Sequence, residues 1–234
     1  PRIKEHCAAG GLSTVYENGF VTIMKGTWKI RVMAAKDIPL TYEGKAVHNI
    51  ANCLPAVLAT YLYRDITIDD IKLGLQTFMP GEALTPGRLN FFHFKNITFL
   101  ADFAHNPHGL KLLCDFVSKL DYKTKVGVIS GTGDRRDEDI MELGEISAQY
   151  FDQIIIRCDK NLRGRTADEI IGLLKEGISK VNPAVPTITI AYENEALEYI
   201  YANQIPGALY TIMCDVVAGA LDKIKELKAR EEQE

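Results

Sequence analysis

Apolar residues in the first forty positions come in short runs that are typical of β-strands, so this part of the chain reads as β. We expect strands at 12–16, 20–25 and 28–33. Asn18 and Gly19 separate the first two runs, and Asn-Gly is a strong signal for a tight hairpin. The sequence therefore predicts a β-hairpin followed by a third strand.

The period of the apolar residues then lengthens to three and four, which indicates helix. We expect a helix over 48–63, although Pro55 predicts that it kinks or begins later. A second helix is expected over 68–78. Residues 79–87 contain two prolines and two glycines and predict a linker. We therefore expect two domains, 1–86 and 87–234.

Beyond the linker, short β-rich runs alternate with amphipathic helical patterns. This alternation is typical of parallel βαβ units, so the fold class is α/β with a mostly parallel sheet. The expected strands are 89–94, 97–102, 125–130, 153–157, 187–191 and 209–214. The expected helices are 107–120, 136–150, 166–181, 193–203 and 216–230.

Composition narrows the function classes. The net charge is −4, so the chain has no global field that would attract nucleic acid or an anionic membrane. The apolar runs are too short for a membrane span and no signal peptide is visible, so we expect a cytoplasmic protein. The five cysteines are widely spaced without a CxxC pair, which predicts buried, reduced thiols rather than disulfides or zinc ligands.

Ligands of open α/β sheets bind at the carboxyl ends of the strands. Asp102 ends one expected strand, and Asn106 is placed to cap the helix that follows. His105 would then lie beside the positive helix end, where anions bind, and Asp102 would suit a sugar hydroxyl or a metal. The alternative is a capped helix with an incidental His and Asp.

Two further strand ends are rich in charge. Residues 131–139 include Asp134, Arg135 and Asp139, and two glycines there permit a tight turn. Residues 157–165 contain three arginines and an aspartate, which suit carboxylates and amines. Both segments are also consistent with solvated helix starts. Neither GxGxxG nor GxxxxGK[ST] occurs. At the last strand end, Asp215 is predicted as a helix N-cap.

Two features precede the α/β region. His48, Asn49 and Asn52 open the first helix with side chains that can bond a purine edge. Arg88 is the single arginine at the hinge. HNxxN at 48–52, PGRLN at 86–90 and DxAHNP at 102–107, in this order, resemble the Mur-ligase superfamily of ATP-dependent amide ligases. GDRRDED at 133–139 and LRGR at 162–165 look like the Mur-ligase-like half of the cyanophycin synthetases.

The resemblance implies a domain assignment. Residues from 87 onward resemble the complete, Rossmann-like C-terminal domain. Residues 1–86 resemble the last part of the central ATP-binding domain, without its P-loop. We therefore expect a fragment of a larger enzyme, with the magnesium ligands in the missing upstream part and no metal site in this chain.

Roles of individual residues also follow from the resemblance. His48, Asn49 and Asn52 would face adenine. Arg88 and His105 would reach the ATP phosphates, as the expected catalytic pair, and Asp102 would bind the ribose. Further residues would contact the incoming amino acid: Asp134, Asp139 or Asp159 for a guanidinium, and Arg163 and Arg165, together with Arg135, for a carboxylate or phosphate.

The implied reaction is amide-bond formation through an acyl phosphate, joining L-arginine to the β-carboxylate of a poly-aspartate backbone. The expected partners are ATP, L-arginine or another amino acid and a growing peptide, in a homo-oligomer. One alternative is a Mur-type or folylpolyglutamate-type ligase that adds a different amino acid. Another is that the isolated chain is only a binding or assembly module.

Overall fold

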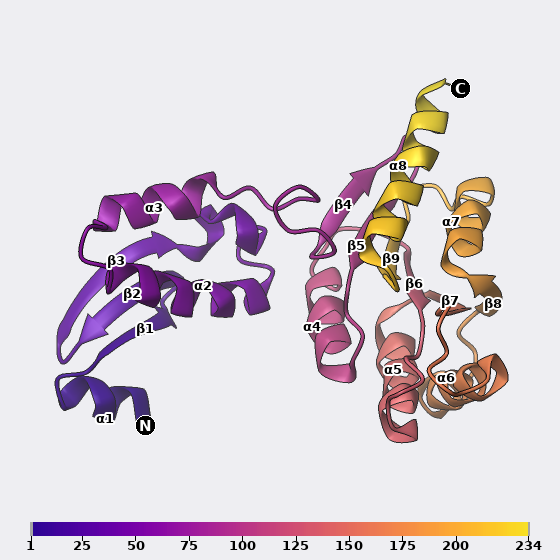
Figure 1. The fold of residues 1–234 in the computed structure, drawn as a ribbon, viewed down its shortest axis with the longest axis horizontal. Coiled ribbons are helices and arrows are strands. Elements are labelled where there is room, and N and C mark those ends of the chain that lie inside the picture. Colours follow the sequence, from indigo (N-terminus) through magenta and orange to yellow (C-terminus); the bar gives the residue numbers. More distant parts are fainter. Residues whose placement is uncertain (1, 234) are drawn as a thin grey trace. The chain divides into compact units, whose positions relative to one another are not determined.

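The computed structural model describes residues 2–233, and the chain divides into two compact units, Pro1–Pro80 and Gly81–Glu234. Figure 1 colours both along the sequence. The expected division after residue 86 falls inside the second unit. There the Thr85 hydroxyl lies 3.1 Å from the Gly81 carbonyl oxygen, and Asn90 Nδ2 donates to the Thr85 carbonyl at 3.0 Å. Residues 81–86 are thus hydrogen-bonded within the second unit.

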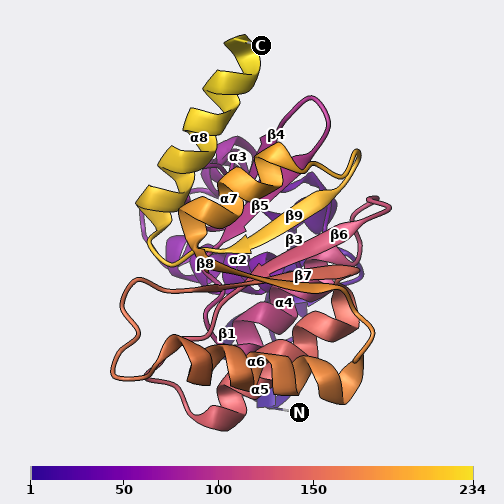
Figure 2. The same cartoon turned by 90° about the vertical axis from the view of Figure 1, so that its right-hand side faces the viewer.

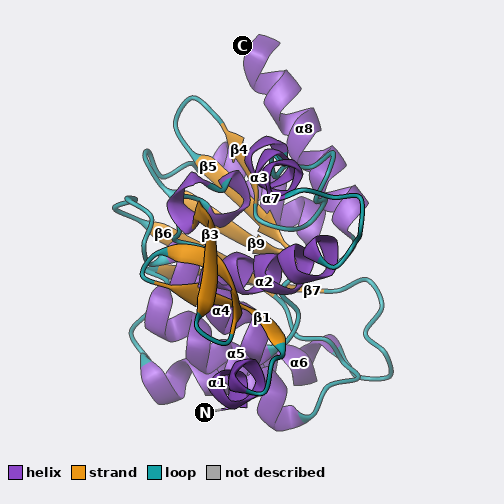
Figure 3. Ribbon diagram, turned by 90° about the vertical axis from the view of Figure 1, so that its left-hand side faces the viewer, coloured by secondary structure: helices purple, strands orange, loops and turns teal. Residues whose placement is uncertain are grey.

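The first unit is a three-stranded antiparallel sheet with helices (Figure 3). Its elements are α1 (Arg2–Ala8), β1 (Leu12–Glu17), β2 (Phe20–Lys25), β3 (Trp28–Ala34), η1 (Ala35–Asp37), η2 (Pro39–Thr41), α2 (Val47–Tyr61) and α3 (Ile68–Thr77). Asn18 and Gly19 both have positive φ, of 51° and 83°, which is the geometry of a two-residue type I′ hairpin. The predicted hairpin is therefore confirmed.

Two expectations for the first unit need correction. Residues 2–8 form a helix rather than β structure, held in place by the Cys7 carbonyl, which accepts from the Gly26 amide at 3.0 Å. Helix α2 begins at Val47, before the expected start, although Pro55 lies inside it. Pro55 is exposed, whereas Cys53 and Val57 are buried against the sheet residues Val21 and Ile23. Packing of this apolar face holds the helix despite its proline.

The second unit is a three-layer α/β sandwich (Figure 2). Its sheet has the order β4-β5-β9-β6-β7-β8, and all of its neighbouring pairs are parallel except β4 with β5. Its strands are β4 (Asn90–His93), β5 (Thr98–Asp102), β6 (Lys125–Ile129), β7 (Gln153–Cys158), β8 (Thr187–Tyr192) and β9 (Leu209–Met213). The α/β class with a mostly parallel sheet is confirmed.

Helices cover both faces of this sheet. One face carries α4 (Pro107–Val117), α5 (Asp137–Tyr150) and α6 (Ala167–Val181), and the other carries α7 (Glu193–Ala202) and α8 (Val217–Gln233) (Figure 2). The inner strands β5, β6, β7 and β9 are buried almost throughout because helices cover them on both sides, whereas β4 and β8 at the edges are only partly buried. Strand β9 lies between β5 and β6, so the carboxyl ends of these three strands and of β7 meet at one edge.

The structure also bears on two expectations from composition, the state of the cysteines and the lack of a membrane span. All five cysteines are free and buried, as expected. Within residues 2–233, the helices are too short or too polar to cross a membrane.

Candidate functional site

A cleft of about 110 Å³ lies at the carboxyl edge of the parallel strands. Residues that follow β5, β6, β7 and β9 line it: Phe103, His105, Thr132, Arg135, Asp159, Arg163, Cys214 and Asp215. Because β9 is inserted between β5 and β6, four segments that are distant in the sequence come together here. This is the position where open α/β sheets bind ligands.

His105 is oriented by its own chain. Its Nδ1 lies 3.0 Å from the Phe103 carbonyl oxygen, which can only accept a hydrogen bond, so Nδ1 carries the proton and Nε2 is left for a ligand. Asn106 caps α4, because its side-chain oxygen accepts from the Gly109 amide at 2.8 Å. The predicted N-cap is confirmed, and His105 lies directly before the positive end of α4.

Asp102 lies behind the cleft rather than on its wall. It is 8% exposed, and its Oδ2 accepts from the Leu89 amide at 2.9 Å. Burial raises the pKa of this carboxyl to about 6, against the lowering effects of the Leu89 amide and the charge of Arg88. Asp102, the residue expected to bind the ribose, thus already has one carboxylate oxygen hydrogen-bonded to the backbone of Leu89, next to the hinge residue Arg88.

Arg88 is held by the same contacts. Leu89 has a φ of 49°, in the left-handed region, and the Phe103 amide donates to the Gly87 carbonyl at 2.9 Å. The Arg88 guanidinium lies 5.7 Å from the centre of the Phe103 ring, which in turn lies 4.7 Å from the His105 ring. Asp102 therefore fixes the backbone beside an arginine that borders the cleft wall.

The charged loops after β6 and β7 pack against each other. A Cβ at Gly133 would overlap the Leu162 carbonyl oxygen, so the close approach requires glycine. Arg163 Nη1 lies 2.6 Å from Asp134 Oδ2, and both side chains are about half exposed. The predicted substrate residues Asp134 and Arg163 thus pair with each other.

Two other predicted substrate residues are engaged away from the cleft wall. Arg165 Nε and Nη2 donate to the carbonyl oxygens of Gly133 and Arg135, both at 2.9 Å. Asp139 accepts two hydrogen bonds from Arg136, at 3.0 and 2.7 Å. Arg165 therefore holds the loop, and Asp139 closes a salt bridge at the start of α5.

Arg135 is placed differently. It lines the cleft, and its Nε is buried without a hydrogen-bond partner. A buried donor that is left without a partner costs free energy.

A buried ion network behind the cleft joins three strand ends. Arg157 is 1% exposed and contacts Asp159, Glu193 and the Met213 carbonyl. Asp159 also accepts from the Ser130 hydroxyl at 2.7 Å. The sequence pattern indicated Arg157 as a surface residue for recognition, and this was wrong. Its place at the buried end of the apolar strand 153–158 was the available signal.

Asp215 is not the predicted N-cap. Helix α8 begins at Val217, and the Val216 carbonyl accepts its first hydrogen bond, from Ala220 at 3.0 Å. Asp215 instead accepts from the Lys160 amide at 3.1 Å and donates its own amide to Glu193 at 2.8 Å. It ties the loop after β9 to the loop after β7 and to α7.

In the first unit, the predicted adenine residues occupy the first turns of α2. Asn49 Nδ2 donates to the Leu40 carbonyl at 2.8 Å, and Asn52 Nδ2 lies 3.4 Å from Asn49 Oδ1. Asn52 is exposed and His48 is partly exposed. Their adenine-binding role stays a prediction.

The family model of the Mur ligase, glutamate ligase domain matches residues 87–214. The chain belongs to the Mur ligase family. Cyanophycin synthetase from Geminocystis herdmanii is 40% identical over 227 residues, which cover 97% of this chain and 26% of that protein. The chain thus spans about a quarter of the length of the cyanophycin synthetases that it matches.

More distant Mur ligases match smaller parts. The UDP-N-acetylmuramoyl-L-alanyl-D-glutamate–2,6-diaminopimelate ligase of Caldanaerobacter subterraneus is 31% identical over 102 residues, which cover 44% of this chain and 20% of that enzyme. A folylpolyglutamate synthase of Mycobacterium tuberculosis, solved with ADP and AMPPCP, superposes with a TM-score of 0.60 at 18% identity. That match covers 90% of this chain and 46% of the other, and it supports the fold.

Within this Mur ligase domain, the structure brings only some predicted residues together. His105, Arg135, Asp159 and Arg163 share one cleft. Arg88 borders it, Asp102 lies behind it, and Arg165 and Asp139 do not line it. Within residues 2–233, no three His, Cys, Asp or Glu side chains are grouped to hold a metal ion.

Proposed function

We propose that this chain is the amino-acid-binding part of an ATP-dependent amide ligase of the cyanophycin synthetase type. One observation carries the proposal: the cleft where His105, Arg135 and Arg163 converge lies in a chain that resembles cyanophycin synthetases over 97% of its length. Three cationic or hydrogen-bonding groups in one cleft suit a reaction that handles phosphate and carboxylate.

The proposed reaction has two steps. A carboxylate of the acceptor peptide attacks the γ-phosphate of ATP, so that an acyl phosphate forms and ADP leaves. The amine of the incoming amino acid then attacks the acyl carbon, and inorganic phosphate leaves as the amide forms. Enzymes accelerate such steps mainly by positioning the reactants and by stabilising the developing negative charge.

This chain supplies groups for both tasks. His105, at the start of α4, and Arg135, with its unsatisfied Nε, would hold a phosphate or an acyl phosphate oxygen. Arg163 would hold the α-carboxylate of the incoming amino acid after exchanging its present partner Asp134 for the ligand. We propose L-arginine as that amino acid, and the β-carboxylate of an aspartate chain as the acceptor.

Magnesium ions are expected to accompany ATP in this class of ligase. Within residues 2–233, no three His, Cys, Asp or Glu side chains are grouped as a ready set of metal ligands. No step is therefore assigned to metal ligands of this chain.

The test is an assay of the complete reading frame that contains this chain. The protein should release phosphate from ATP only when L-arginine and an aspartate-containing acceptor are both present. The 234-residue chain alone should release none, because it contains no GxxxxGK[ST] motif. Phosphate release that ignores amino acids, or that the short chain performs by itself, would contradict the proposal.

The 31% identity to a diaminopimelate ligase favours a second candidate, in which another amino acid takes the place of arginine. The same assay separates the two candidates. Diaminopimelate, glutamate and lysine are offered in turn, and faster phosphate release with any of them than with L-arginine supports the second candidate.

A further inference from the structure

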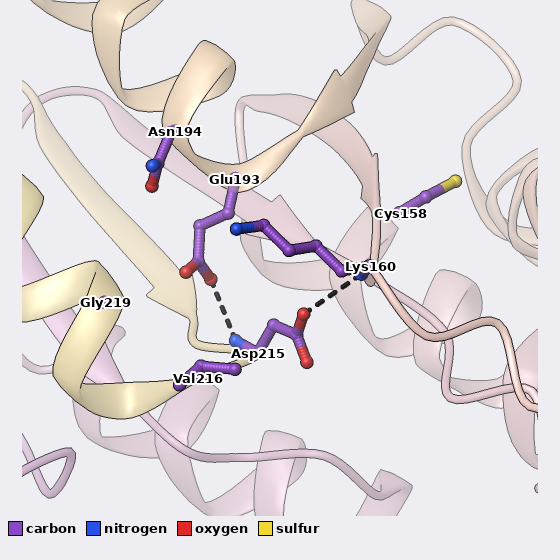
Figure 4. A pocket seen from close by; sticks show the side chains of 7 residues that line it. All are labelled: Cys158, Lys160, Glu193, Asn194, Asp215, Val216 and Gly219. Carbon is purple, nitrogen blue, oxygen red and sulfur yellow. Dashed lines mark hydrogen bonds between the residues drawn. The ribbon is translucent and has the colours of Figure 1, made fainter.

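A second cavity of about 60 Å³ adjoins the cleft and shares Asp215 with it (Figure 4). Lys160, Glu193 and Asn194 contribute to its wall, and Gly219 in the first turn of α8 closes one side. A space of this size holds a group of a few heavy atoms, because about 10–15 Å³ of such space is enough for one water. It would take the end of a side chain rather than a whole ligand.

The charges around this cavity do not balance. Arg157 is the one fully buried cation, and it faces two largely buried carboxylates, Asp159 and Glu193, whose side chains are 10% and 11% exposed. Glu193 also accepts from the Asp215 amide through Oε2, which is the oxygen that meets Arg157. Asp215 and Lys160 also line the cavity, so three carboxylates stand against two cations, an excess of one negative charge. Burial raises the pKa of Glu193, which is the direction expected when a carboxylate lacks full compensation.

A cation in the cavity would supply the missing charge. Lys160 extends toward Glu193 in Figure 4. Among residues 2–233, however, Glu193 forms its ion pair with Arg157, and none within 4.0 Å joins it to the ammonium group of Lys160. The cavity wall therefore favours a cation. A ligand cation with shorter contacts would be bound more strongly than Lys160 is.

The other acidic residues near the cleft are already matched with arginines. Asp134 pairs with Arg163, and Asp139 pairs with Arg136. Of the three carboxylates expected to receive a guanidinium, Asp159 is the partner of the buried Arg157. Glu193, which the sequence did not indicate, and Asp215 are the carboxylates that line the cavity.

We propose that the cavity beside Glu193 and Asp215 is the specificity subsite that binds the cationic side-chain end of the incoming amino acid. The proposal rests on the proposed function, because it takes the α-carboxylate to lie at Arg163 in the adjoining cleft. A guanidinium would donate to the free oxygens of Glu193 and Asp215 and displace the Lys160 side chain toward solvent. The chemical class is a cationic amino acid.

The experiment is an NMR titration of the 234-residue chain with L-arginine and with L-citrulline, which has the same shape but a neutral end. L-arginine should shift the amide signals of Asn194, Asp215 and Gly219 and bind about ten- to hundredfold more tightly than L-citrulline, the range of a charge-assisted contact. Glu193→Gln should remove most of that preference. The matched control is Glu195→Gln, an exposed acid in the same turn of α7.

A second variant leaves every charge in place. A Cβ at Gly219 meets nothing within 4 Å, so Gly219→Leu can fold and its side chain narrows the cavity. Gly219→Leu should weaken the binding of L-arginine at least tenfold. Gly172→Leu, at an open helical position in α6, is the matched control and should bind like the unchanged chain.

The outcomes separate this inference from the proposed function. If L-arginine shifts His105 and Arg163 but binds no better than L-citrulline, or if Glu193→Gln and Gly219→Leu both bind L-arginine normally, the inference is overturned and the proposed function stands. If no amino acid shifts the signals of the cleft or the cavity, both fail.

Discussion

Two sets of arginine–carboxylate contacts lie at the same edge of the sheet, one buried and one exposed. Arg157, whose side chain is 1% exposed, lies behind the cleft and pairs with the largely buried Asp159 and Glu193. Arg163 with Asp134 and Arg136 with Asp139 lie on the surface. Both sets join a guanidinium to a carboxylate, so they differ in how far solvent reaches the charged groups.

That difference separates structural from binding roles. A buried charge that loses its partner keeps its desolvation cost, so the Arg157 network holds the ends of β6, β7 and β9 in place. An exposed pair is screened and loses little when it opens, so Arg163 can exchange Asp134 for a ligand. The variants below test this division, beginning with the largest expected effect.

Arg157→Met should lower the free energy of unfolding by about 3–5 kcal/mol, because it leaves Asp159 and Glu193 buried without their cation. Urea denaturation at pH 7 measures this loss. A triple variant that also carries Asp159→Asn and Glu193→Gln should recover part of it, since no uncompensated charge remains. An Arg157→Met chain as stable as the unchanged one would abolish the distinction between the two sets.

Asp102→Asn probes a buried carboxylate that has no buried cation. The folded-state pKa of about 6 lies above the ordinary 3.8, so the unchanged chain loses stability as pH rises between these values. Two units correspond to about 3 kcal/mol. The Asn variant lacks this loss, and its amide oxygen can still accept from Leu89. The stability difference between variant and unchanged chain should therefore grow in favour of the variant from pH 4 to pH 7. A difference that does not change with pH would show that Asp102 ionises normally.

Arg163→Ala should leave the midpoint of urea denaturation nearly unchanged and weaken the binding of L-arginine about tenfold. Its pair with Asp134 is half exposed, whereas its contact with a ligand carboxylate is charge-assisted. Parallel denaturation and NMR titration of one sample separate the two effects. Loss of stability without loss of binding would place Arg163 with the buried set.

Asp139→Asn should have the smallest effect, changing neither stability nor L-arginine binding measurably. The residue pairs with the exposed Arg136 and does not line the cleft. The same two measurements apply. Weaker binding of L-arginine would instead support the prediction from the sequence that Asp139 contacts the incoming amino acid.

Local chemistry explains which elements could be predicted. Asn18-Gly19 determines its own turn, because few other residue pairs adopt positive φ twice at low cost. Asn106 caps α4 through a hydrogen bond that spans three residues, and Pro107 suits the first helical position. Alternating apolar runs and amphipathic helices were sufficient to predict the parallel sheet.

Contacts between distant segments explain the errors. Asp215 has the residue type and position of an N-cap, but the Lys160 amide, far away in the sequence, takes its side chain. Helix α1 is too short to be stable alone, and its contact with Gly26 depends on the hairpin. The engagement of Asp102 with Leu89 likewise depends on how the hinge segment folds back onto β5.

The sequence by itself determined the α/β class, the family and the strand ends where charged residues gather, because these depend on periodicity and on short motifs. Only the tertiary structure decided which of those charges are buried, paired or open to a ligand. The strand order places β8 beside β7, so that Glu193 reaches Arg157, and it brings the end of β9 close enough for the Met213 carbonyl to contact the same guanidinium. No local pattern encodes that strand order. Electrostatic interactions depend on distance and solvent exposure, and both are set by the packed fold.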